Sequence, residues 1–150
     1  MIKTIQSSSL RTGLFILGAL LLMVRCSKDE EGIACCVEPV GSAAYYFTNQ
    51  TSEDIMVEFT LSEELGRQVV DTLPPLEGES TTLILTDGII GVNPLPSNSF
   101  SEIRVYSIGD SQHPLKTISP IKNEDWNVVS SERNESGYGL TEYEYRFEMP

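Results

Sequence analysis

The chain has 150 residues, of which 22 are acidic and ten basic, and its formal net charge at pH 7 is −12. A field of this sign repels phosphate backbones, and the sequence contains no basic stripe, so we expect no binding to nucleic acid. One histidine and three cysteines leave too few ligands for an ordinary zinc site, and no calcium-binding loop motif is present, so the sequence predicts neither a metal ion nor a cofactor.

The first 25 residues have the organisation of a secretion signal. Lys3 and Arg11 precede an apolar run at residues 14–24, and a basic segment followed by an apolar core is what export requires. The run is shorter than the roughly 20 apolar residues that cross a bilayer. We therefore expect residues 1–25 to be a cleaved signal peptide and not a membrane span.

Cys26 follows this apolar run after a single residue, Arg25, and the arrangement resembles a bacterial lipoprotein signal. The resemblance implies that Cys26 is the first mature residue and carries acyl chains such as palmitate, which would anchor the protein to the membrane. Several chains are needed, because each buried CH₂ contributes only about 0.8 kcal/mol. The alternatives are an ordinary secreted protein without lipid, or processing at Cys35, which ends the small-residue segment "GIAC".

The five residues after Cys26 resemble the surface-export tag of lipoproteins in the Bacteroidota, in which a polar residue and Lys precede consecutive acids. The resemblance implies an outer-membrane protein that faces outward. A generic solvated spacer is the alternative, and in either case we expect residues 26–42 to form a flexible acidic tether. The tag residues are Ser27, Lys28, Asp29, Glu30 and Glu31.

Cys35 and Cys36 are neighbours, and a disulfide between them would close only a strained ring. A metal site would need more ligands, and the single histidine, His113, is far along the chain. We expect both cysteines to be free thiols or to pair with another chain.

Residues 43–150 have the pattern of one all-β domain. Short β-rich runs are separated by Gly, Pro and Asp turn residues, which favours an antiparallel β-sandwich of about seven or eight strands. Alternation predicts that one face of residues 55–61 and one face of residues 143–149 lie in the core, and that Ile103 and Val105 point inward while Tyr106 points outward. The runs are residues 44–49, 54–61, 66–73, 80–86, 101–108, 114–121, 126–131 and 141–149.

The succession "TNQTSEDIMVEFTL", "LPPLEGESTTLIL", "SEIRVYSI" and "YEYRFEM" resembles the small immunoglobulin-like (Ig-like) lipoprotein domains of the Bacteroidota. The resemblance covers most of the mature chain and implies an Ig-like sandwich with a role at the cell surface and no enzymatic activity. The Cys-Trp-Cys framework of antibody domains is absent from the sequence.

No motif in the sequence points to catalysis. Neighbouring acids on a strand face opposite ways, "TDGIIG" at residues 86–91 is expected to be a tight turn, and His113 has no obvious nucleophile. We therefore expect a binding module without enzymatic activity, possessing a role in nutrient or glycan capture. The alternatives are a secreted hydrolase or cation-dependent enzyme, with carboxylates converging on His113, and a structural surface subunit with exposed apolar sheet edges.

Two further site hypotheses concern sugars. Tyr138, which lies between two glycines, and Trp126 are predicted to offer flat aromatic faces to an extracellular glycan, with a protein ligand as the alternative partner. "DTL" at residues 71–73 resembles the site at which Bacteroidota glycosylate exported proteins. That resemblance makes Thr72 the candidate attachment site.

Overall fold

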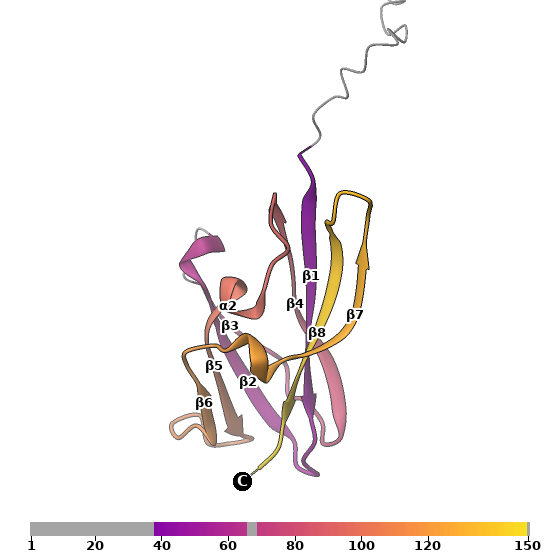
Figure 1. Ribbon diagram of the computed structural model, residues 1–150. Helices are drawn as coiled ribbons and strands as arrows, with labels where there is room; N and C mark the ends of the chain where they lie inside the picture. Colours follow the sequence, from indigo (N-terminus) through magenta and orange to yellow (C-terminus); the bar gives the residue numbers. More distant parts are fainter. Residues whose placement is uncertain (1–37, 66–68, 150) are drawn as a thin grey trace, which may run out of the picture. The chain divides into compact units, whose positions relative to one another are not determined.

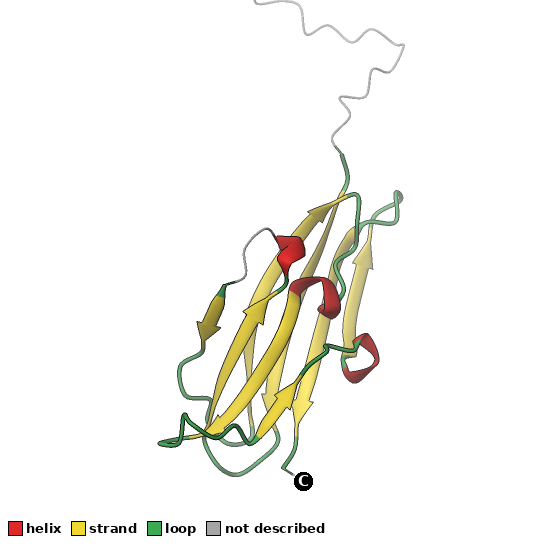
Figure 2. Ribbon diagram, turned by 90° about the vertical axis from the view of Figure 1, so that its left-hand side faces the viewer, coloured by secondary structure: helices red, strands yellow, loops and turns green. Residues whose placement is uncertain are grey.

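The computed structural model describes residues 38–65 and 69–149, which form an all-β domain (Figure 1). The described residues contain eight strands, in agreement with the seven or eight expected from the sequence. They are β1 (Val40–Asn49), β2 (Ile55–Leu61), β3 (Val70–Thr72), β4 (Ser80–Ile90), β5 (Phe100–Ser107), β6 (Lys116–Ile118), β7 (Asn127–Arg133) and β8 (Gly139–Phe147). The short helical turns η1 (Glu63–Leu65), α2 (Pro96–Ser99) and η2 (Asn123–Asp125) lie in the connections (Figure 2).

The strands form two four-stranded sheets, with the orders β4-β1-β8-β7 and β3-β2-β5-β6. The predicted β-sandwich is confirmed, but the expectation of purely antiparallel pairing is wrong at one place. β1 and β8 are parallel, with Tyr45 opposite Tyr143 and Phe47 opposite Tyr145. A parallel pair needs a long crossover, and here most of the domain lies between the two strands.

The core lies between the sheets and follows the predicted alternation. Ile55, Val57 and Phe59 of β2 are buried, as are Ile103 and Val105 of β5. Aromatic side chains fill the centre, because alternate residues of β1 and β8 point the same way. These side chains are Tyr45, Phe47, Phe100, Trp126, Tyr143, Tyr145 and Phe147.

Two residues were assigned to the wrong environment. Met149 was expected in the core but is 42% exposed, because β8 ends at Phe147. Tyr106 was expected to face solvent but is only 6% exposed, although it lies opposite Met56 on the outer side of its sheet. Alternation predicts the face of a strand and not what covers that face.

The predicted boundary of the tether and one predicted turn are also wrong. β1 begins at Val40 rather than after residue 42, and Val40 pairs with Ile90 at the far end of β4. Since β1 continues this far, the Asp87-Gly88 pair remains in the sheet, with Gly88 opposite Ser42. The chain turns only at Gly91, whose φ of 71° suits glycine.

The predicted signal peptide, the predicted lipidation site Cys26, the predicted export tag at residues 27–31 and the cysteines at positions 35 and 36 all lie outside the described residues. Among the residues that are described, no helix has both the length and the apolar character to cross a membrane.

Candidate functional site

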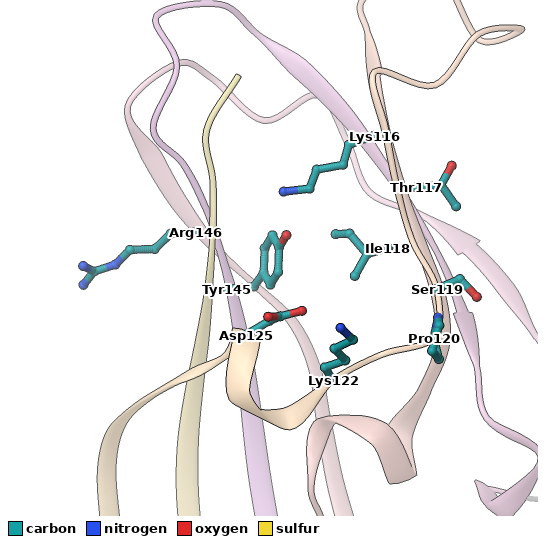
Figure 3. Close-up of a pocket in the computed structure, with 9 residues that line it drawn as sticks. All are labelled: Lys116, Thr117, Ile118, Ser119, Pro120, Lys122, Asp125, Tyr145 and Arg146. Carbon is teal, nitrogen blue, oxygen red and sulfur yellow. The ribbon is translucent and has the colours of Figure 1, made fainter. Parts of the chain in front are cut away.

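A cleft opens at the edge of the sandwich, where β6 of one sheet faces β8 of the other (Figure 3). We call it the edge cleft; its volume is about 490 Å³, within the range of small-molecule sites. It is lined by Lys116, Thr117, Ile118, Ser119, Pro120, Lys122, Asp125, Tyr145 and Arg146.

The path of the chain creates this cleft. β6 has only three residues and ends just before Ser119 and Pro120, and proline has no N–H with which to extend the ladder. The chain then leaves this sheet, passes through η2 and enters β7 of the other sheet. Residues 119–125 thus bridge the two sheets and provide one wall of the cleft.

Tyr145 forms the floor of the cleft and is held by the core. Its ring stacks on Phe47 with 5.5 Å between centroids and meets Trp126 edge-on at the same distance. The Lys116 ammonium lies over the Tyr145 ring, 5.5 Å from its centroid, and makes a cation–π contact with it. The Tyr145 hydroxyl has no hydrogen-bond partner among the described residues.

The charges of the cleft are largely unpaired. Neither Lys116 nor Lys122 forms an ion pair with any described acid. Figure 3 shows Lys116 on one side and Lys122 with Asp125 on the opposite side, with the Tyr145 ring between them. Arg146 extends to the other face of β8, where its Nη2 lies 2.8 Å from Glu144 Oε2.

This concentration of positive charge is unusual in the domain, because residues 38–150 contain 19 acids and six bases. Lys116 and Lys122 are its two lysines. Arg104, by contrast, lies on β5 in the same sheet as Lys116 and is neutralised by Glu102 at 2.6 Å and Glu58 at 3.5 Å. The edge cleft is therefore suited to an anionic group.

A second hollow lies on the outer face of the sheet that contains β1, lined by Tyr46, Thr81, Val129, Glu142 and Glu144. Its acids are already satisfied. Glu142 accepts hydrogen bonds from Ser130 and Tyr46, and its charge raises the pKa of the Tyr46 hydroxyl. The Thr48 hydroxyl, 2.5 Å away, and then Arg146 lower the pKa of Glu144.

The predicted aromatic platform for sugars is wrong. Trp126 is only 5% exposed, and its ring stacks on Phe100 within the core at 5.7 Å. Tyr138 is half-buried in the hairpin between β7 and β8. The whole of β7 separates the two residues, so they cannot share a ligand.

Thr72 is exposed at the end of β3, an edge strand. Its backbone N–H donates to the neighbouring Asp71 carboxylate at 2.8 Å. The side chain is accessible to a modifying enzyme, and its glycosylation stays a prediction.

His113 lies in the connection between β5 and β6, with a side chain that is 85% exposed. Its ring contacts Asp110 at 3.2 Å, and the backbone of Gln112 together with this contact lowers the pKa of Asp110. The described residues therefore do not bring His113 into the cleft that the hydrolase alternative requires. Nor do any three His, Cys, Asp or Glu side chains in the described ranges gather closely enough to hold a metal ion.

Sequence reasoning did not single out Lys116, Lys122 or Tyr145. The sequence predicts a strand over residues 114–121, of which only residues 116–118 are a strand, and it predicts Tyr145 as a core residue, which is confirmed. The available signal was the presence of two lysines six positions apart, on either side of Ser119-Pro120, in a domain otherwise devoid of lysine. Their convergence on Tyr145 depends on the packing of the two sheets.

Comparison with known proteins gives no relative from which a function could be transferred. No family model matches the chain, and neither a search of curated proteins nor a search of solved structures found a match. What the structure supports is a β-sandwich of two four-stranded sheets.

Proposed function

We propose that this protein is a lipid-anchored binding module on the outer surface of a bacterial outer membrane, similar to the small Ig-like lipoprotein domains of the Bacteroidota. Cys26, which only Arg25 separates from the apolar run, is its site of acylation, and the acidic segment that follows directs it outward. The sandwich starts at Val40, which leaves residues 26–39 as the tether.

The observation that carries a binding role is the edge cleft. Two lysines without acidic partners among the described residues line it on either side of the Tyr145 ring, in a domain with a large excess of acids. Ligand sites commonly combine an apolar floor with a few convergent polar groups. The described lining of the cleft combines such groups with the apolar side chain of Ile118, and the role we propose for it is capture of a ligand.

The anchoring part of the proposal is tested by the intact mass of the membrane-extracted protein, beside the Cys26→Ala variant. We expect a triacylated chain that starts at Cys26, and loss of the domain when whole cells are treated with protease. An unlipidated chain, or a lipidated chain that withstands protease on intact cells, would contradict anchoring or outward exposure respectively.

A second candidate function, a structural surface subunit, is favoured by the edges of the β1 sheet. Both edge strands expose apolar side chains, with Leu83 and Ile90 on β4 and Val128 and Val129 on β7. Exposed edges of this kind are templates for pairing with another chain. Analytical ultracentrifugation of the extracted protein distinguishes the two roles. A binding module is expected to be monomeric, with the same sedimentation in the Val129→Lys variant. An assembling subunit is expected to form oligomers that the Val129→Lys substitution disrupts.

A further inference from the structure

The edge cleft offers both signs of charge to a small ligand. Lys116 and Lys122 supply two ammonium groups, and Asp125 supplies one carboxylate on the same side as Lys122 (Figure 3). None of the three forms an ion pair with another described residue. A ligand that complements this set carries one negative charge and, close to it, hydrogen-bond donors for Asp125.

The uncharged part of the lining limits the ligand further. Ile118 is buried and Pro120 is exposed on one side of the cleft, and the Tyr145 hydroxyl is open on the other. These groups accommodate a short carbon skeleton with a polar substituent. The volume of the cleft, about 490 Å³, and its side-chain hydrogen-bond donors suit a small-molecule ligand better than a protein ligand.

Charge also distinguishes between anions. A phosphate dianion would meet the Asp125 carboxylate within the cleft and a domain with 19 acids around it, and like charges at short range disfavour binding. Arg146, the only arginine among the lining residues, turns its guanidinium away from the cleft toward Glu144 and so does not offer the bidentate geometry that phosphate favours. A carboxylate monoanion carries half the charge of a phosphate dianion, so its repulsion by Asp125 and by the acidic domain is weaker.

We propose that the edge cleft binds a small carboxylate with hydrogen-bond donors beside it, in which Lys116 and Lys122 hold the carboxylate and Asp125 accepts the donors. This assignment rests on the proposed binding function and specifies its ligand. Two sources share the chemistry: a sugar acid, whose donors are hydroxyls, and an amino acid, whose donor is an ammonium.

The test is calorimetric titration of the full-length protein, extracted in a mild detergent, with glucuronate and with alanine. Acetate provides a carboxylate without donors, glucose provides hydroxyls without charge, and inorganic phosphate provides a dianion. We expect glucuronate or alanine to bind with a Kd of roughly 1 mM, and acetate, glucose and phosphate to bind at least about tenfold more weakly. The better of the first two identifies the source.

Three variants separate the roles of the residues. Lys122→Gln should weaken the better ligand about fivefold to tenfold by loss of one charged hydrogen bond. Asp125→Asn should weaken the same ligand but not acetate, since acetate has no donor for it. Arg133→Gln is the matched control, because it removes one positive charge from the exposed end of β7, outside the cleft, and should change the Kd less than twofold.

Each contrary result overturns the proposal. Equal losses in Lys122→Gln and Arg133→Gln would mean that net charge and not the cleft governs binding, and tighter binding of phosphate than of either carboxylate would make this a phosphate site. No binding of glucuronate or alanine at about 50 mM, far above the expected Kd, would refute the ligand assignment. Lipidation at Cys26 and exposure at the cell surface are tested by separate experiments, so failure of the ligand assignment would not affect them.

Discussion

Asn49 holds together one end of the sandwich, and its replacement should be among the most damaging single changes in the domain. The side chain is fully buried at 0% exposure, at the end of β1. Its Nδ2 donates to the backbone carbonyls of Glu53 at 2.7 Å and Glu77 at 3.1 Å. Its Oδ1 accepts from the Thr51 backbone N–H at 3.0 Å and from the Thr51 hydroxyl at 2.8 Å.

Asn49→Ala removes these four hydrogen bonds, so the two backbone carbonyls and the two donors of Thr51 lose the side-chain amide as a partner. A hydrogen bond contributes about 1 kcal/mol net, and a buried group left unsatisfied costs about 1–3 kcal/mol. Because part of the turn at residues 50–54 can reach water after the change, we expect a loss of about 3 kcal/mol in the free energy of unfolding. That is a large share of the roughly 5–15 kcal/mol that stabilises a domain.

The assay is urea unfolding of the detergent-extracted protein, followed by the fluorescence of Trp126, the single tryptophan. Gln50→Ala is the matched control, since it removes the same functional group from an exposed neighbour, and should lie within about 0.5 kcal/mol of the wild type. Asn49→Asp should be no better than Asn49→Ala at neutral pH, because its second oxygen would face two carbonyls. An Asn49→Ala variant as stable as Gln50→Ala would refute the reasoning.

Two further predictions concern β8. Thr48→Val should raise the pKa of Glu144 toward its ordinary value, because the hydrogen bond from the Thr48 hydroxyl is the main cause that lowers it; NMR titration measures this change. A lowered carboxyl pKa stabilises the fold at pH values above the ordinary pKa. The loss of stability in the variant should therefore be complete at neutral pH and shrink on acidification, which unfolding at several pH values measures. Gly139→Ala should destabilise the domain by about 1–3 kcal/mol, because a Cβ there would lie 2.0 Å from the Glu132 carbonyl oxygen. Gly88→Ala is the control and should be tolerated, because its Cβ would have its nearest contact at 3.5 Å. Equal thermal unfolding temperatures of the two variants would contradict this.

The strands of this protein could be predicted because the relevant signal is local. Period-two alternation assigns Ile55, Val57 and Phe59 to the core from their own sequence. The ends of strands depend on their partners. Gly88 follows Asp87 as in a tight turn, yet it lies in β4 because β1 extends far enough to pair with it.

The edge cleft could not be predicted in the same way. Lys116 and Tyr145 are 29 positions apart and belong to different sheets, so no spacing rule brings them together. The platform hypothesis failed for the related reason that Trp126, near a turn in the sequence, fills the core between the sheets. Aromatic residues are the largest contributors to a core, and their exposure is decided by packing.

The most direct test of the proposed binding site is a set of backbone amide NMR spectra of the full-length protein, recorded while glucuronate or alanine is added. If the edge cleft is the site, the resonances that shift should be confined to residues 116–125 and to the β8 residues Tyr145 and Arg146. Shifts centred on Tyr46 and Val129, on the outer face of the β1 sheet, would assign binding to the other hollow. The absence of any shift with either ligand would contradict the account.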